Sequence, residues 1–196
     1  MSRLVAFLRG INVGGHRVKM DRLAAVFAAS GGRDVATFIA SGNVIFTSGV
    51  RSEPTLRRRL EQALARELGY AVPVLLRTPA EVRAVVAFPA FAPGAGEAEG
   101  HSVQVLFLNE PPGDGVTHAL EGLSSERDVF RVHGREVYWL SRGRLTDSPV
   151  TMPILEKALA RAVNTMRNRT TLRKLAGLLD PGPAAGAGAG DSSKVE

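Results

Sequence analysis

The residues best suited to binding a charged ligand lie at positions 9–15, where the sequence reads RGINVGG. Its three glycines let backbone N–H groups turn toward a ligand without obstruction by a Cβ atom. Because a helix-like segment begins shortly afterwards, free N–H groups and the helix dipole would also favour an anion. Arg9 and Lys19 could neutralise a phosphate or a carboxylate. We call residues 9–15 the glycine loop and predict that it binds an anion.

A second polar motif, Ser41-Gly42-Asn43, lies between two strand-like segments and predicts a short hairpin connection. In a ferredoxin-like sheet the first and third strands are adjacent and antiparallel, so the first ends where the third begins. We therefore expect this motif and the glycine loop to share one end of the sheet. Asn12, Ser41 and Asn43 would offer neutral hydrogen-bonding groups there. The alternative is that these residues only satisfy the backbone of their own turns.

A third polar cluster, NTMRNRTT, occupies residues 164–171 and is expected at the junction of two helices. There its side chains and the free N–H groups of the last helix could face one anion. A capped, solvated helix junction is the alternative. The candidate ligand-binding residues from all three segments are Arg9, Gly10, Asn12, Gly14, Gly15, Lys19, Ser41, Gly42, Asn43, Arg167, Asn168 and Thr171.

The sequence lacks the residues that several common kinds of functional site require. It has no cysteine, which excludes disulfides and zinc–thiolate sites, and its four histidines are far apart. We predict no metal, because no two histidines form an i,i+4 ligand pair and no dense carboxylate cluster accompanies them. We predict no cofactor, and the glycine loop matches neither the Walker nor the dinucleotide fingerprint. The strand beginning at Asn43 lacks the paired aromatic residues on which RNA bases stack. No nucleophile elbow or other catalytic group is evident, so the sequence leaves open whether the protein is an enzyme.

Composition places the chain among ordinary globular proteins. Its 196 residues are 44% hydrophobic and 22% charged, with a formal net charge of +6. Such an excess can support binding to phosphates or nucleic acid, and a basic solvated surface is the alternative. No apolar segment reaches the length of a membrane span, and the N-terminus does not resemble a signal peptide. We therefore expect a cytoplasmic protein with no membrane partner; its oligomeric state is not predicted.

The hydrophobic pattern predicts an α+β fold whose first half, residues 1–78, has the ferredoxin-like order βαββαβ. Its strands are expected at residues 4–8, 35–40, 43–47 and 72–76, and its helices at residues 20–30 and 56–68. A second α+β domain is expected over residues 79–180, opened by a capping box at Thr78-Pro79-Ala80-Glu81. Its strands are expected at residues 103–108, 128–132 and 136–140. C-terminal helices follow at the place where a fourth strand would be needed to repeat the βαββαβ order of the first half. Residues 181–196, rich in Gly, Ala and Pro, predict a disordered tail.

The blocks LRGINVGG, with VKM downstream, SGNVIF and TMRNRTTLRKL resemble the bacterial family called domain of unknown function 1697. The resemblance spans roughly residues 3–180, and its motifs fall on the candidate residues of the glycine loop and of Ser41-Gly42-Asn43. Near the C-terminus they fall on Thr165, Arg167, Asn168 and Thr171. The chain departs by placing Arg169 where an aromatic residue is usual, and Thr146-Asp147-Ser148-Pro149 where a Ser-Lys-Leu-like segment is common. The family implies an architecture and a site, but no reaction.

The first hypothesis is therefore a cytoplasmic protein that binds a phosphate-bearing ligand, a nucleotide or a nucleic-acid backbone, at the glycine loop. A second is an enzyme that acts on a small anionic metabolite in the groove between the two halves. A third is a protein-interaction module whose polar motifs only maintain the fold.

Overall fold

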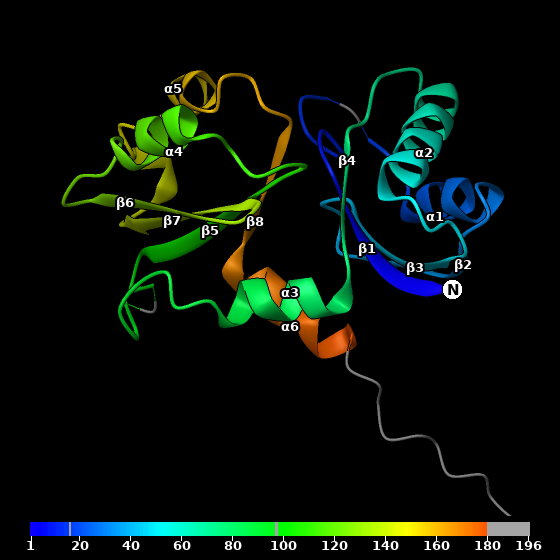
Figure 1. Ribbon diagram of the computed structural model, residues 1–196, viewed down its shortest axis with the longest axis horizontal. Helices are drawn as coiled ribbons and strands as arrows, with labels where there is room; N and C mark the ends of the chain where they lie inside the picture. The colour runs from blue at the N-terminus through cyan, green and yellow to red at the C-terminus, as the bar shows by residue number, and fades with distance from the viewer. Residues whose placement is uncertain (16, 97, 180–196) are drawn as a thin grey trace, which may run out of the picture.

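The computed structural model describes residues 1–15, 17–96 and 98–179, which form two similar series of elements (Figure 1). The first unit comprises β1 (Ser2–Leu8), α1 (Met20–Ala29), β2 (Arg33–Phe38), β3 (Asn43–Ser48), α2 (Glu53–Leu68), β4 (Val74–Arg77) and α3 (Pro79–Ala87). The second unit comprises β5 (His101–Leu108), α4 (Asp114–Glu121), β6 (Asp128–His133), β7 (Glu136–Arg142), α5 (Met152–Ala158), β8 (Asn164–Asn168) and α6 (Arg169–Leu179). A short 3₁₀ helix, η1 (Leu145–Asp147), precedes α5. The predicted tail lies outside the described residues.

Each unit contains one four-stranded antiparallel sheet. The strand orders are β2-β3-β1-β4 and β6-β7-β5-β8, which are the same order once the second sheet is renumbered. The α+β class and the ferredoxin-like first half are therefore confirmed. The second half is more regular than its sequence suggested, because each unit is a complete βαββαβ motif followed by one further helix.

The prediction for residues 164–168 was wrong, because they form strand β8 rather than a junction between helices. This strand pairs antiparallel with β5 from Asn164 opposite Leu108 to Asn168 opposite Gln104. Its two buried side chains, Thr165 and Arg167, are polar, and Met166 alone of its residues packs against an apolar core, so the strand lacks the apolar alternation by which a half-buried strand is recognised.

The last helix follows β8 directly. Helix α6 begins at Arg169, and the Thr170 N–H donates to Oδ1 of Asn168 at 2.8 Å. The side chain of Asn168 therefore caps this helix by binding one of its free N–H groups.

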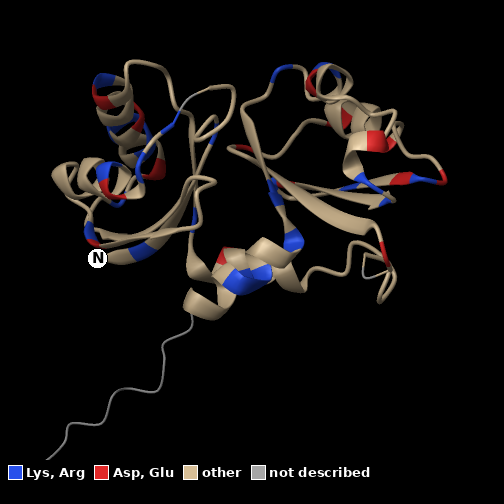
Figure 2. Ribbon diagram, turned by 180° about the vertical axis from the view of Figure 1, so that it is seen from behind, with Lys and Arg blue, Asp and Glu red and all other residues tan. Residues whose placement is uncertain are grey.

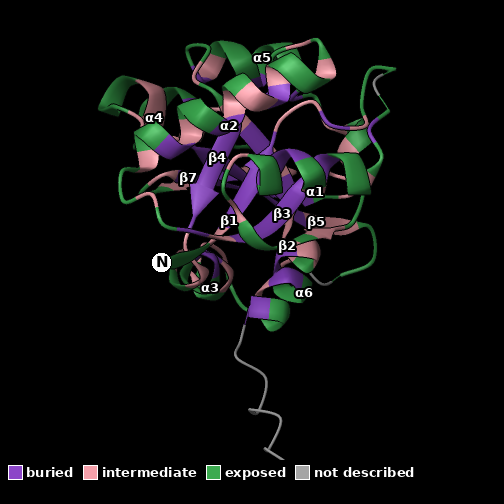
Figure 3. Cartoon of the chain, turned by 90° about the vertical axis from the view of Figure 1, so that its right-hand side faces the viewer, coloured by how far each residue is buried: buried purple, intermediate pink, exposed green. Residues whose placement is uncertain are grey.

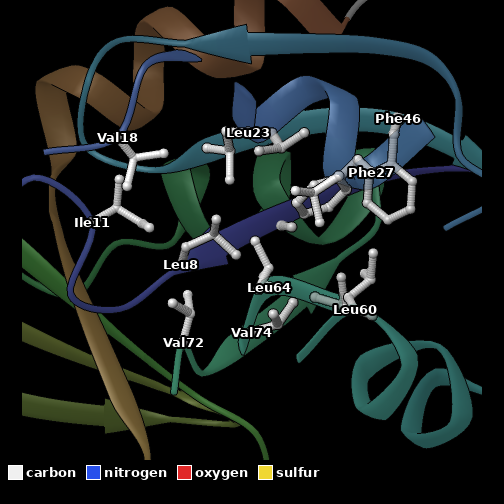
Figure 4. Packing of buried hydrophobic residues seen from close by; sticks show 14 of the residues in the cluster. Leu8, Ile11, Val18, Leu23, Phe27, Phe46, Leu60, Leu64, Val72 and Val74 are labelled. Atoms are coloured by element: carbon white, nitrogen blue, oxygen red, sulfur yellow. The ribbon is translucent and has the colours of Figure 1, made fainter. Parts of the chain in front are cut away.

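Local sequence explains α2 and α3 well. In α2, Leu56, Leu60 and Leu64 lie one turn apart and are buried, and Gly69 ends the helix at a φ of 81°. The predicted capping box at Thr78 is present at the start of α3. Figure 4 shows Leu8 of β1 among side chains of α1 and α2, in the core between the first sheet and these two helices. No helix in the described part of the chain is both long and apolar enough to cross a membrane.

A further core joins the two units. It contains Val5 and Phe7 of the first sheet, Phe107 and Tyr138 of the second, and side chains of α3 and α6. The rings of Phe7 and Phe107 stack with their centroids 4.2 Å apart. Figure 1 shows α3 and α6 together at one end of both sheets, and Figure 3 shows burial concentrated on the strands. The division at residue 78 stays a prediction, and it falls between segments that share this core.

Candidate functional site

Strand pairing places the glycine loop beside the Ser41-Gly42-Asn43 turn, as the sequence predicted. Strand β1 pairs with β3 from Ser2 opposite Ser48 to Phe7 opposite Asn43. The Leu8 N–H then donates to the carbonyl of Gly42 at 2.9 Å. The loop and the turn therefore lie at the same end of the first sheet.

The side chain of Asn12 forms hydrogen bonds from the glycine loop to two neighbouring segments. Its Oδ1 accepts from the Val18 N–H at 2.7 Å, and its Nδ2 donates to the Ala40 carbonyl at 2.8 Å. The residue has a φ of 55°, a left-handed conformation that asparagine tolerates better than most residues. These contacts connect the loop both to the start of α1 and to the β2–β3 turn. A ligand-binding role for Asn12 stays a prediction.

Replacing Asn12 by alanine is expected to lower the free energy of unfolding by about 1–3 kcal/mol, because Val18 N–H and Ala40 O lose their partner. Urea unfolding measures this loss. Asn12→Gly is the matched control, since glycine adopts the same φ without strain but also lacks the amide. Equal losses in both variants would assign the cost to hydrogen bonds, whereas an unchanged stability in both would contradict the internal role of this side chain.

The glycine loop keeps several donors available. Gly10, Gly14 and Gly15 have φ values of 79°, 60° and 89°, with open space where a Cβ would lie. Within the described residues, the backbone N–H groups of Gly10, Ile11, Asn12, Gly14 and Gly15 donate no hydrogen bond. Successive free N–H groups of this kind are typical of anion-binding loops.

Arg167 connects the same sheet end to the second unit. Its Nε donates to Oδ1 of the fully buried Asn43 at 2.6 Å, and its Nη2 donates to the carbonyls of Leu8 at 2.9 Å and Ser41 at 2.8 Å. Its Nη1 donates to Oγ1 of Thr165 at 2.8 Å. The structure thus brings together residues from the first, second and third polar segments of the sequence.

The charge of Arg167 has no counter-ion among the described residues. All of its hydrogen-bond acceptors are neutral carbonyl, amide or hydroxyl oxygens. Burial lowers the pKa of Arg167 to about 10, which still leaves the guanidinium protonated at neutral pH. The site therefore contains a buried positive charge that is solvated by dipoles but not neutralised.

Arg77 occupies the corresponding position in the first unit. Arg77 lies opposite Val5 in β1, as Arg167 lies opposite Val105 in β5. Its Nη2 donates to the Leu108 carbonyl at 2.8 Å, just as Arg167 binds the carbonyl of Leu8. The two arginines are therefore related by an approximate twofold arrangement of the units.

The two arrangements differ in one partner. Arg77 Nε donates to the Glu136 carboxylate at 2.8 Å, where Arg167 meets the neutral amide of Asn43. Burial lowers the pKa of Arg77, and the nearby Glu136 charge opposes that effect. One buried cation is thus neutralised within the protein and the other is not.

A cavity of about 310 Å³ lies beside Arg167, between the glycine loop, α5 and β8. We call it the α5 cavity. Four predicted residues line it, namely Arg9, Gly10, Ser41 and Arg167. Figure 1 shows α5 and the segment after β1 at the same end of the molecule. The cavity therefore lies where the two units meet.

An ion pair joins the two units at this cavity. Arg9 Nη2 lies 2.6 Å from Oε1 of Glu156 on α5, and the two side chains are 41% and 52% exposed. A pair this exposed contributes little stability, so a ligand could replace either partner at low cost. Glu156 was not among the residues predicted from the sequence, because only the fold places α5 against the glycine loop.

The other predicted residues are distributed elsewhere. Lys19 is exposed and Thr171 half-buried, and neither lines the α5 cavity. Asn168 faces a second cavity of about 470 Å³, together with Arg169, Thr170 and Arg173. Among the described residues, no three or more His, Asp or Glu side chains gather as a metal site would require.

Comparison with known sequences confirms the family suggested by the two N-terminal motifs, and the matched residues end before the C-terminal motif. The family described as "Protein of unknown function (DUF1697)" matches residues 1–138, and the chain belongs to this family. No curated protein matches the chain. Among solved structures, the chain is similar to the conserved bacterial protein SP0830 from Streptococcus pneumoniae, at 25% identity and a TM-score of 0.70. That match covers 91% of this chain and 98% of the other.

Proposed function

We propose that this protein binds a small phosphate-bearing ligand in the α5 cavity. The observation that carries the proposal is that Gly10 and Ile11 line this cavity and that their N–H groups donate no hydrogen bond within the described residues. Arg9 at the same cavity and the charge of Arg167 add an attraction for anions.

The distribution of charge favours a small ligand over a nucleic-acid backbone. Figure 2 shows Lys and Arg spread over both units and interspersed with Asp and Glu, rather than gathered in one stripe. Binding along a nucleic-acid backbone generally needs a continuous basic surface.

Two substitutions at the ion pair are expected to change ligand affinity in opposite directions. Arg9→Gln removes a cation beside the ligand and should weaken binding at least tenfold, or about 1.4 kcal/mol. Glu156→Gln removes the competing carboxylate and should strengthen binding about two- to fivefold. Titration calorimetry with inorganic phosphate and AMP measures both changes.

The matched control is Arg17→Gln, because Arg17 is an exposed arginine that follows the glycine loop and does not line the α5 cavity. It should leave both affinities within twofold of wild type. Losses of the same size in all three variants, or no saturable binding of any phosphate compound by the wild type, would contradict the proposal. Binding only of a short oligonucleotide, weakening steeply with salt, would favour the nucleic-acid hypothesis instead.

A further inference from the structure

We propose that the ligand of the α5 cavity is an anionic amphiphile with an aliphatic body, such as an alkyl phosphate, rather than a nucleotide. This inference rests on the proposed function, because it specifies the chemistry of a ligand for the same cavity. It follows from three features of the site: the side chains that form its walls, the apolar groups exposed at its edge, and the charge at its base.

The walls of the cavity are aliphatic. Ile11 and Val13 line it on the side of the glycine loop, and Met152, Leu155 and Leu159 line it on the side of α5 and the residues after it. No aromatic side chain belongs to the described lining residues. Proteins commonly hold nucleobases by stacking them on aromatic rings and by hydrogen bonds to the base edges. These walls instead suit a saturated chain, to which the flexible side chain of Met152 can adapt.

The edge of the cavity also exposes apolar surface. Val13 is 59% exposed and Met152 is 48% exposed, although both line the cavity. Large exposed side chains of this kind, from two different segments, can cover the part of an aliphatic chain that extends outward. The volume of about 310 Å³ lies near the lower end of the range for small-molecule sites.

The charge of Arg167 favours an anionic ligand, since the one carboxylate that lines the cavity, that of Glu156, is already paired with Arg9. In the related position of the first unit, Glu136 neutralises Arg77, whereas Asn43 leaves the charge of Arg167 without a carboxylate. Arg167 lines the α5 cavity, where an anionic head group would supply the missing negative charge. The N–H groups of Arg167 already donate to protein acceptors, so Arg167 would attract the head group only by its charge, without a direct hydrogen bond. The backbone N–H groups of Gly10 and Ile11 would bind the head group directly.

The test compares octyl phosphate, AMP and inorganic phosphate, each titrated into the full-length protein below the micelle concentration of the amphiphile. Octyl phosphate should bind at least tenfold more tightly than AMP or inorganic phosphate. Met152→Glu should then reduce the affinity for octyl phosphate at least tenfold. Ile154→Glu is the matched control, since Ile154 lies on the same helix turn, is 42% exposed and does not line the cavity. It should leave the affinity within twofold, and circular dichroism should confirm that both variants are folded.

The outcomes separate this inference from the proposed function. If AMP binds as tightly as octyl phosphate or more tightly, the aliphatic ligand is wrong and the phosphate site stands. If no phosphate compound binds, both are wrong. Equal loss of octyl phosphate binding in the Met152 and Ile154 variants, or no loss in either, would show adsorption outside the α5 cavity and overturn the inference.

Discussion

Replacing Arg77 by methionine is expected to lower the free energy of unfolding by about 3–5 kcal/mol, the range for breaking a buried ion pair from one side. Arg77 is 1% exposed, and its loss would leave the buried Glu136 carboxylate without a counter-charge and the Leu108 carbonyl without a donor. Urea unfolding at neutral pH measures the effect.

The pH dependence of this variant identifies its cause. A buried carboxylate without a partner is stabilised when it takes up a proton. The difference in unfolding free energy between the wild type and the variant should therefore shrink as the pH falls and grow as the pH rises. The double variant Arg77→Met, Glu136→Leu should recover much of the stability, because it removes both charges. A loss below about 1 kcal/mol that does not vary with pH would mean that the ion pair is unimportant for stability.

Replacing Arg167 by methionine is expected to cost about 3 kcal/mol or more, because several buried acceptors lose their donor together. The acceptors are the Leu8 and Ser41 carbonyls and the Asn43 amide. This loss should not vary between about pH 5 and 8, since it leaves no carboxylate behind. In the folded protein, burial lowers the pKa of Arg167 to about 10, and in the unfolded chain the pKa is higher still. Arg167 therefore stays protonated in both states throughout that pH window.

Asn43→Ala is the companion variant for Arg167. It should cost less, about 1–3 kcal/mol, because Arg167 keeps its other acceptors. Urea unfolding of both variants at two pH values measures these losses, which are then compared with those of Arg77→Met. A stable Arg167→Met variant, or one whose deficit depends on pH as that of Arg77→Met does, would contradict the difference between the two arginines.

The first unit could be predicted because its inward-facing residues are apolar. In β1 the run from Val5 to Leu8 is wholly buried, and in α2 the leucines repeat at helical spacing. Strand pairing then placed the glycine loop beside the Ser41 turn, which required only the topology. Strand β8 could not be predicted in the same way, because its two buried side chains, Thr165 and Arg167, are polar.

The rest of the site depends on how the units pack. Arg77 ends the buried run VLLR, and nothing in that sequence distinguishes it from an arginine that reaches solvent. Its partner Glu136 lies 59 residues away, and Glu156 lies 147 residues from Arg9. Contacts across such separations follow from the approach of the two sheets, which no local pattern encodes. For the same reason the sequence could suggest a groove between the two halves but not the α5 residues that line the cavity.

The reciprocal arginines make the two units depend on one another. Arg77 belongs to the first unit but binds groups of the second, whereas Arg167 belongs to the second unit but binds groups of the first. Either unit alone would expose the face that carries Phe7 or Phe107 and would leave its own arginine without these partners. Although the two units have the same strand order, we therefore expect that neither folds stably when it is produced without the other.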